Sequence, residues 1–222
     1  MKQIRFYLDF ISPYAYLAFE ELPQALMGLS YSVTYKPLLF AALLKHHGQL
    51  GPAEIPAKRD WTYRQVQWLA HNKGCMLDMP AAHPFNPLGL LRLALAMDRN
   101  GQPNRYVCET LFRHVWVGGA DAADAQRLQD VAHTLAQGQP LAADPLSAAV
   151  KARLQAHTDE AIAQAVFGVP AFGVDGKVFW GLDALPMLRD YLLGSPWFAD
   201  GDADARWHRV RDQASGIPLR AA

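Results

Sequence analysis

Neither sign of charge is in excess in this sequence: 21 Lys and Arg residues stand against 21 Asp and Glu residues. Binding to a nucleic-acid backbone or to an anionic membrane surface depends on a surplus of basic residues. We therefore expect no nucleic acid and no membrane among the partners of this protein.

Long apolar runs are missing as well. Arg5 and Asp9 interrupt the first ten residues, which therefore do not form a signal-peptide core, and no later run reaches the roughly 18 apolar residues of a membrane span. The chain has 222 residues, 51% of them hydrophobic, which is enough for a substantial core. We expect a globular protein of the cytoplasm.

Cysteine is scarce. Cys75 and Cys108 lie far apart and match neither a C-x-x-C redox motif nor a metal-binding spacing, so we interpret both as ordinary thiols. No motif with metal-ligand spacing is formed by His46, His47, His83 and His114. The sequence predicts no metal site.

What the sequence does contain is a strand–helix–strand beginning. Residues 3–10, QIRFYLDF, alternate with a period of two, which predicts a strand. Ser12 and Pro13 then begin a predicted helix that runs to Gly28, with Pro23 expected to shorten or kink it. A β-rich run at 31–39 completes a βαβ unit, whose strands are normally parallel.

From about residue 41 to 167 strand signals stop and helical patterns take over. The predicted helices cover residues 57–73, 87–99, 103–117, 121–137 and 145–167. Two short strands, AFGV and KVFW, then flank an Asp175-Gly176 turn, which predicts a hairpin. A last helix, capped by Asp183, is expected to end at Gly194.

This order predicts an α/β protein in which both ends of the chain build one sheet. We expect residues 1–40 and 168–222 to form a thioredoxin-like domain and residues 41–167 to form an inserted, all-helical domain. The arrangement resembles a thioredoxin fold interrupted in the manner of the bacterial disulfide oxidoreductases of the DsbA type.

Ser12 is the most informative candidate for chemistry. It stands at the N-terminus of the first predicted helix, where free N–H groups and the helix dipole favour an anion and the hydroxyl can donate one more hydrogen bond. A bound thiolate would fit there. Ser12 can equally be a structural N-cap, and the two roles do not exclude each other.

Two further segments could bind a peptide-like ligand. If Pro170 is cis, the backbone of Val169 is free to pair with an extended peptide; a trans proline that opens an edge strand is the alternative. Before the last helix, free N–H groups could take a carboxylate while Asp183 accepts from an ammonium group; otherwise Asp183 is a helix cap.

Six segments together resemble one family, the 2-hydroxychromene-2-carboxylate isomerases, with the related kappa-class glutathione transferases, which share a DsbA-like fold. The segments are DFISPYAYLA (9–18), GPAEIPAKRDW (51–61), HPFNPL (83–88), VW (115–116), FGVPAF (167–172) and FWGLDAL (179–185). They follow the family's order and span nearly the whole chain.

The resemblance implies glutathione as cofactor and a homodimer. It implies that Ser12 binds the glutathione sulfur, that Val169 pairs through its backbone beside cis-Pro170, and that the γ-glutamyl end is held by two further residues. These two residues are Leu182 and Asp183.

Lys58 matches a family lysine near the active site. With Arg59 it could meet the glycyl carboxylate or an anionic substrate, and it is the candidate for stabilising an enolate. Gln49 stands where relatives often have asparagine at the glutathione site, and Asp183 is followed by Ala184 where many have arginine. The first departure affects one contact with glutathione or the substrate. The second removes a positive charge near the site.

Aromatic and polar side chains near these segments could line a pocket for an aromatic substrate. The candidates are Tyr14, Arg59, Trp61, Asn86, Trp116 and Trp180.

The resemblance implies an isomerase in aromatic catabolism that adds and then eliminates a thiol, so that a conjugated C=C bond can rotate. A hydroxyl at Ser12 cannot cycle between thiol and disulfide, which argues against a dithiol oxidoreductase. Two alternatives stay open: a kappa-class-like glutathione transferase, which releases the conjugate, and a non-catalytic binding module with a thioredoxin fold.

Overall fold

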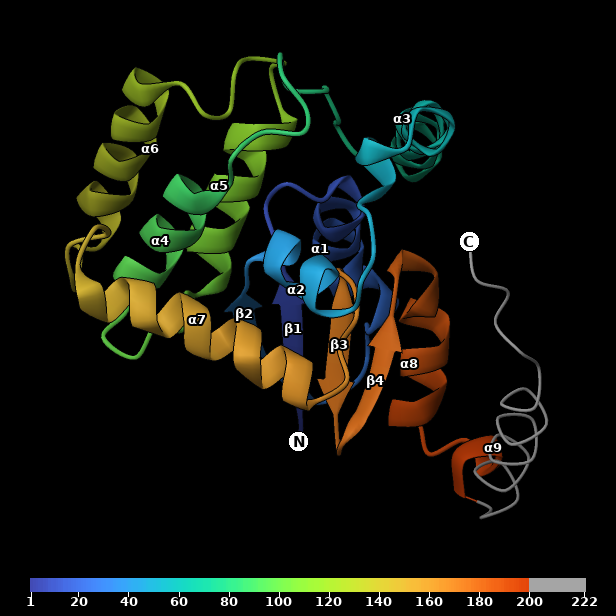
Figure 1. The fold of residues 1–222 in the computed structure, drawn as a ribbon. Helices are drawn as coiled ribbons and strands as arrows, with labels where there is room; N and C mark the ends of the chain where they lie inside the picture. Colours follow the sequence, from blue (N-terminus) through green and yellow to red (C-terminus); the bar gives the residue numbers. More distant parts are fainter. Residues whose placement is uncertain (200–222) are drawn as a thin grey trace.

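Both ends of the described chain build one four-stranded sheet, and the helices between them cover it (Figure 1). The structure is a computed structural model and describes residues 1–199. The strand order is β2-β1-β3-β4. The strands are β1 (Lys2–Leu8), β2 (Tyr31–Pro37), β3 (Ala171–Val174) and β4 (Lys177–Trp180). This is the thioredoxin-like α/β fold with many helices that the sequence predicts.

Helices before the helical block and within it are α1 (Pro13–Ala25), α2 (Phe40–His46), the 3₁₀ helix η1 (Pro52–Glu54), α3 (Pro56–Lys73), α4 (Leu88–Ala96), α5 (Arg105–Trp116), α6 (Ala125–Gly138) and α7 (Ala148–Ala163). After the sheet is complete come the 3₁₀ helix η2 (Leu182–Ala184), α8 (Leu185–Leu192) and α9 (Pro196–Ala199). In Figure 1, α7 crosses one face of the sheet, and α1 and α8 lie on the other side.

The pairing of the strands follows from the connections. β1 and β2 are parallel, as a βαβ unit requires, whereas β3 runs antiparallel to β1 and β4 antiparallel to β3. The turn of the β3–β4 hairpin is Asp175-Gly176, with φ of 49° and 77°, the left-handed pair that this dipeptide favours. The predicted hairpin is confirmed.

Tyr7 corrects the simple alternation expected for the first strand. Its side chain is fully buried, like those of its neighbours Phe6 and Leu8. Helices cover both faces of the sheet, so Tyr7 packs on the second face, against Leu43 and Ala161 among others. Its hydroxyl donates to Glu160, and burial together with that carboxylate raises the pKa of Tyr7 to about 12.

The end of the fold differs from the prediction for Asp183. This residue lies inside η2, its side chain makes no capping hydrogen bond, and α8 begins only at Leu185. Gly181 explains the arrangement: its φ of 104° suits glycine, and a Cβ there would collide with the Asp183 carboxylate. The first helix also ends earlier than expected, at Ala25, two residues beyond Pro23.

Aromatic packing joins the helical block to α1. The ring of Phe112 on α5 lies 4.9 Å from Phe10, 5.2 Å from Phe19 and 5.9 Å from Tyr16, measured between centroids. All four side chains are buried. This cluster fixes α5 beneath the segment that leads from β1 into α1.

Helix α3 stands off from the sheet in Figure 1 and has only two buried residues, Val66 and Ala70. Polar contacts attach it to α1 along its length. The Tyr14 hydroxyl donates to Gln65 Oε1 at 2.6 Å, and Lys73 pairs with Glu21 at 2.5 Å.

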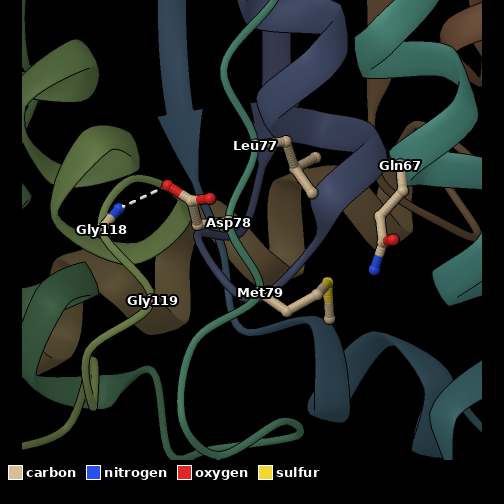
Figure 2. A pocket seen from close by; sticks show the side chains of 6 residues that line it. All are labelled: Gln67, Leu77, Asp78, Met79, Gly118 and Gly119. Atoms are coloured by element: carbon tan, nitrogen blue, oxygen red, sulfur yellow. Dashed lines mark hydrogen bonds between the residues drawn. The ribbon is translucent and has the colours of Figure 1, made fainter.

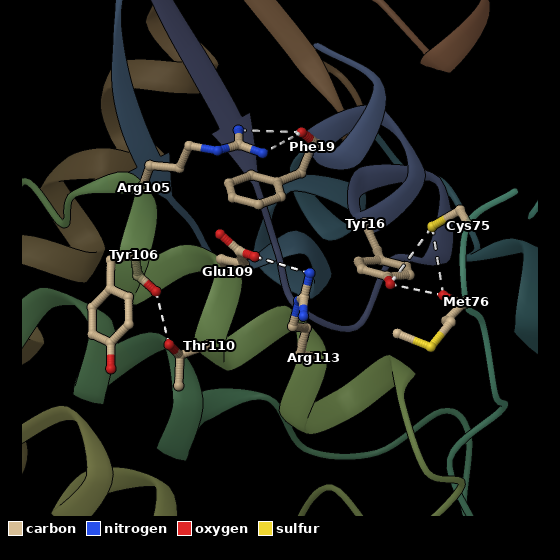
Figure 3. A network of polar contacts seen from close by, with 9 residues as sticks. All are labelled: Tyr16, Phe19, Cys75, Met76, Arg105, Tyr106, Glu109, Thr110 and Arg113. Carbon is tan, nitrogen blue, oxygen red and sulfur yellow. Dashed lines mark hydrogen bonds and ion pairs between the residues drawn. The ribbon is translucent and has the colours of Figure 1, made fainter. Parts of the chain in front are cut away.

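Just beyond α3, the Tyr16 hydroxyl donates to the Met76 carbonyl oxygen at 2.7 Å, and Cys75 Sγ lies 3.6 Å from the same hydroxyl (Figure 3). A cavity of about 460 Å³ adjoins this network, between α1, Cys75 and Arg113. The chain that leaves α3 is thereby held against α1.

Among residues 1–199, no helix combines the length and the apolar character needed to cross a membrane.

The aromatic cluster predicts a large stability effect at one position. Phe112→Ala should lower the free energy of unfolding by about 3–5 kcal/mol, because the ring is fully buried and its neighbours cannot close the cavity. Denaturant unfolding followed by fluorescence measures this. Tyr106→Ala, on the same helix but 52% exposed, is the control and should change stability by no more than about 0.5 kcal/mol. Equal effects of the two substitutions would contradict the assigned core.

Candidate active site

Ser12 caps α1 and is buried, with 7% of its surface exposed. Its Oγ accepts from the Ala15 N–H at 3.2 Å, so the structural cap expected as one alternative is present. The hydroxyl hydrogen is not used by that bond and remains available to a ligand. The helix N-terminus therefore offers one hydroxyl donor and a positive end of the dipole to an anion.

The segment before β3 lies beside this helix start. Ala171 pairs with Tyr7 on the antiparallel strand, which places Pro170 and Val169 next to the end of β1. The Val169–Pro170 bond is cis. In the part of the chain that the structure describes, neither the N–H nor the C=O of Val169 has a hydrogen-bond partner. Of the two isomers that the sequence left open, the structure has the cis form that the resemblance implies, and the Val169 backbone is free to pair with an extended ligand.

The turn after β4 completes this side of the site. The Gly181 N–H donates to the Pro170 carbonyl oxygen at 2.9 Å, which brings η2 to the proline. Leu182 is buried there, whereas Asp183 is exposed. Burial raises the pKa of the Tyr14 hydroxyl, and the nearby Asp183 carboxylate raises it further. The Asp183 carboxylate is therefore near enough to Tyr14, at the start of α1, to act on its ionisation.

Three side chains hold the backbone of residues 9–12, which connects β1 to α1. The Asp9 carboxylate accepts from the Ile11 N–H at 3.2 Å and from the Phe40 N–H, at the start of α2, at 2.9 Å. The Trp116 indole donates to the Phe10 carbonyl oxygen at 3.0 Å. The ring of His83 donates from Nε2 to the Ile11 carbonyl oxygen, 2.9 Å away.

Asp9 is fully buried, and among residues 1–199 no cation contributes to the shift of its pKa. Burial raises the pKa of this carboxyl to about 7, although the backbone N–H groups of Phe40, Ile11 and Phe10 act in the opposite direction. The group therefore ionises near neutral pH, three residues before Ser12.

Helix α3 supplies the positive charges expected near the site. Lys58 is exposed, and Arg59 is partly exposed and lies 3.8 Å from the Asp60 carboxylate. Trp61 is 59% exposed. The Tyr14–Gln65 hydrogen bond joins the same helix to the start of α1, so the site and these residues belong to connected elements.

The other expected residues are placed less centrally. Gln49 is exposed, and two residues before it the ring of His47 contacts the Val166 carbonyl oxygen at 3.1 Å, which brings the Gln49 loop toward the Val169 segment. Asn86 is exposed, and its Oδ1 accepts from the Leu88 N–H at the start of α4, which occupies that oxygen.

The remaining candidate tryptophans, Trp116 and Trp180, differ in their exposure to solvent. Trp116 is fully buried, so the structure places it behind residues 9–12 and not on a surface that a substrate can reach. Trp180 is 52% exposed and packs against Phe167 in a tilted arrangement, with 4.8 Å between ring centroids. It also covers Gly168, where a Cβ would lie 2.5 Å from the indole nitrogen.

Sequence reasoning missed three residues that shape the site: Asp9, Gln65 and His83. Asp9 and His83 occur within quoted segments, 9–18 and 83–88, but neither was singled out for a role. A carboxylate at the end of an otherwise buried strand was a usable signal, since such a group needs a specific partner. Gln65 gave no signal of this kind.

A cavity of about 470 Å³ opens on the other side of α3 (Figure 2). Its lining contains none of the residues that the sequence singled out: it consists of Gln67, Leu77, Asp78, Met79, Gly118 and Gly119. The Asp78 carboxylate accepts from the Gly118 N–H at 2.9 Å and so fixes the cavity wall.

Comparison with known proteins gives a consistent result. The family described as the DSBA-like thioredoxin domain matches residues 3–193. The chain is 30% identical over 205 residues to a 2-hydroxychromene-2-carboxylate isomerase of Sphingobium xenophagum, which covers 86% of this chain and 98% of that protein. It is 26% identical over 213 residues to glutathione S-transferase kappa 1 of Rattus norvegicus, with 87% and 92% covered.

Among solved structures, a 2-hydroxychromene-2-carboxylate isomerase resembles the fold with a TM-score of 0.66 and 22% identity, over 97% of this chain and 100% of that one.

The buried Asp9 predicts an unusual dependence of stability on pH. Because its pKa in the folded protein, about 7, lies above the ordinary value of 3.8, its contribution to stability is complete below about pH 4 and is lost as the pH rises to about 7. The loss amounts to at most about 4 kcal/mol. Asp9→Asn should flatten the decline in the free energy of unfolding between pH 4 and 8, measured by denaturant titration.

Asp60→Asn is the matched control, because the Asp60 side chain is 72% exposed and should leave the pH dependence unchanged. If the free energy of unfolding depends on pH in the same way in the wild type and in Asp9→Asn, the raised pKa of the buried Asp9 carboxyl is contradicted.

Proposed function

The chain belongs to the DSBA-like thioredoxin domain family, and within it to the 2-hydroxychromene-2-carboxylate isomerases; from this premise we propose that it is a glutathione-dependent isomerase. Its substrate would be 2-hydroxychromene-2-carboxylate or a similar aromatic electrophile. The observation that carries the proposal is a free hydroxyl donor at the start of α1, beside the unpaired backbone of Val169.

The residues present fit glutathione. Ser12 would donate to the sulfur, and the N-terminus of α1 would favour its thiolate form. A lowered thiol pKa matters because the thiolate is the nucleophile. The Ser12 hydroxyl supports this without being oxidised itself.

The peptide part of glutathione finds complementary groups on the opposite side. Val169 offers one N–H and one C=O for antiparallel pairing, next to Pro170. At η2, Leu182 would contact the γ-glutamyl end and Asp183 would accept from its ammonium group. Gln49, in the loop that approaches Val169, is the candidate for a further polar contact.

When bound, glutathione supplies a thiol that adds reversibly to a conjugated C=C bond, makes it a single bond until the thiol leaves, and so permits rotation. The chain supplies the charges around this chemistry. Lys58 would offset the negative charge that the substrate gains during addition, and Arg59 would bind a substrate carboxylate. Tyr14, Trp61 and Trp180 are the aromatic candidates for the pocket wall, with Asn86 at its edge; Trp116 would support the pocket from within the core.

We also propose the assembly and organisation expected of this family: a homodimer in the cytoplasm, active in aromatic catabolism. Residues 1–40 and 168–222 would form the thioredoxin-like domain and 41–167 the inserted domain. Of these, residues 200–222 lie outside the described part of the chain.

A second candidate function is a kappa-class-like transferase, favoured by the likeness to the rat enzyme over 87% of the chain. The site residues would be shared, and the conjugate would be released instead of reversed. A binding module without turnover is less well supported, because a scaffold needs no combination of Ser12, unpaired Val169 and Asp183.

The stoichiometry of glutathione separates these functions. An isomerase should convert many equivalents of 2-hydroxychromene-2-carboxylate per glutathione, because the thiol is returned. With one tenth of an equivalent of glutathione we expect the reaction to reach the same equilibrium mixture of isomers as with excess glutathione, followed by absorbance and by mass spectrometry of the thiol. Consumption of one glutathione per product would instead identify the transferase, and binding without conversion would identify the module.

Ser12→Ala should remove thiolate stabilisation. We expect the thiolate absorbance of bound glutathione at neutral pH to disappear and the turnover number to fall by about 10²–10³, the effect of losing one donor to a developing anion. Ser147→Ala is a matched control, because Ser147 caps α7 through an equivalent bond to Val150, 3.3 Å long. Both substitutions should lower stability by about 1 kcal/mol. Equal turnover in the two variants would refute the role of Ser12.

A further inference from the structure

The imidazole of His83 forms a bridge between α3 and the segment before Ser12. On one side its Nδ1 lies 2.7 Å from the Tyr63 hydroxyl, and on the other its Nε2 lies 2.9 Å from the Ile11 carbonyl oxygen. Tyr63 belongs to α3, and Ile11 directly precedes Ser12. Two hydrogen bonds therefore connect α3 with the residue next to the proposed sulfur-binding serine.

The chemistry of the partners fixes the proton arrangement. A carbonyl oxygen only accepts, so Nε2 must carry a hydrogen, and Nδ1 of the neutral ring is then an acceptor for Tyr63. The same hydroxyl also lies 3.0 Å from the His83 carbonyl oxygen, so it contacts His83 at two acceptors. Burial lowers the pKa of His83, which favours this neutral form. The ring also lies 5.6 Å from the indole of Trp116, the donor to Phe10. The position of the imidazole is thus fixed from three sides.

Helix α3 carries the residues proposed to meet the substrate. Lys58 and Arg59 lie at its first turns, and Tyr63 follows about one turn later. Since α3 has few buried residues, its placement depends on polar contacts such as this one. A change in the position of α3 would reach Ser12 through a chain of only two hydrogen bonds.

We propose that His83 is a positioning residue for Ser12, and that the chain Tyr63–His83–Ile11 aligns the sulfur-binding hydroxyl with the substrate-binding helix α3. The assignment of sulfur binding rests on the proposed function; the positioning of residues 9–12 does not. His83 touches neither ligand in this proposal and acts only through the Ile11 carbonyl group.

The experiment compares four variants with the wild type. His83→Ala removes both ring bonds, and His83→Gln restores a donor near the place of Nε2. Tyr63→Phe leaves the bond to Ile11 in place and removes the contacts of the Tyr63 hydroxyl with His83 Nδ1 and with the His83 carbonyl oxygen, 3.0 Å away. His114→Ala is the matched control, because the His114 Nε2 also contacts a backbone carbonyl oxygen, that of Ala122, at 3.0 Å, without contacting residues 9–12.

Two probes, glutathione and S-methylglutathione, separate positioning from general binding. In His83→Ala we expect the pKa of the bound thiol, measured by thiolate absorbance, to rise by about 0.5–1 unit, and glutathione affinity at pH 7 to fall by about three- to tenfold, the equivalent of one hydrogen bond. Affinity for S-methylglutathione, which forms no thiolate, should change by less than about twofold. Tyr63→Phe should show a smaller effect of the same kind.

His83→Gln should return the thiol pKa toward that of the wild type, and His114→Ala should not move it. An unchanged thiol pKa in His83→Ala, or an equal change in His114→Ala, would overturn the proposal. If His83→Ala does not fold, Tyr63→Phe decides: a raised thiol pKa in this variant supports the proposal, and an unchanged one overturns it.

Amide hydrogen exchange without any ligand provides the independent arm. The Ser12 N–H donates to the Asp9 carbonyl oxygen at 3.1 Å, and its exchange should accelerate by about three- to tenfold in His83→Ala but not in His114→Ala. If the wild type does not bind glutathione, the proposed function fails. The exchange rate of the Ser12 amide then remains as the test of whether His83 positions residues 9–12. Unchanged Ser12 exchange would overturn that positioning.

Discussion

The structure depends on how the chain leaves β1. Between Asp9 and Ser12 the backbone departs from the sheet while still inside the protein, so its N–H and C=O groups need partners other than a neighbouring strand. Asp9 itself satisfies the Ile11 N–H, Trp116 the Phe10 carbonyl group and His83 the Ile11 carbonyl group. Two of these three partners come from the helical block. The block is therefore part of the site's framework and not merely a cover for the sheet.

Much of the fold could be predicted from local patterns. Period-two alternation, the Asp-Gly turn and the Ser-Pro helix start each depend on neighbouring residues, and the corresponding elements lie within a few residues of their predicted bounds. The errors arose where tertiary packing decides. Tyr7 is buried because α7 covers the second face, and α2 is a short helix whose start is joined to the buried Asp9 by the Phe40 N–H. Neither fact is contained in the local sequence.

The candidate site divides in the same way. The Ser12 cap and the place of the Val169-Pro170 segment could be predicted because a cap and an X-Pro pair are local features, whereas the cis isomer followed only from the family resemblance. The contacts that orient them are not local: 72 residues separate His83 from Ile11, and 51 separate Gln65 from Tyr14. At Asp183 the local prediction itself is wrong. The sequence there suits a helix cap, but the structure turns the Asp183 carboxylate back over Gly181.

Because Ser12 stands at the start of α1, the protein itself carries no negative charge at this helix N-terminus. A cysteine there would gain its own negative charge, which the dipole of α1 would stabilise, and the protein would become the redox partner. With Ser12, the same field acts on whatever anion the site binds, and the protein stays neutral at this position. Asp9 adds to this, because a carboxyl group whose pKa is about 7 carries little charge below neutrality and so opposes a nearby anion only weakly. When ionised, this carboxylate accepts from the Ile11 N–H, before the first turn of α1, and from the Phe40 N–H at the start of α2. The proposed thiolate at Ser12 would therefore meet the least repulsion from Asp9 below neutral pH, where an unassisted thiol would be almost entirely protonated.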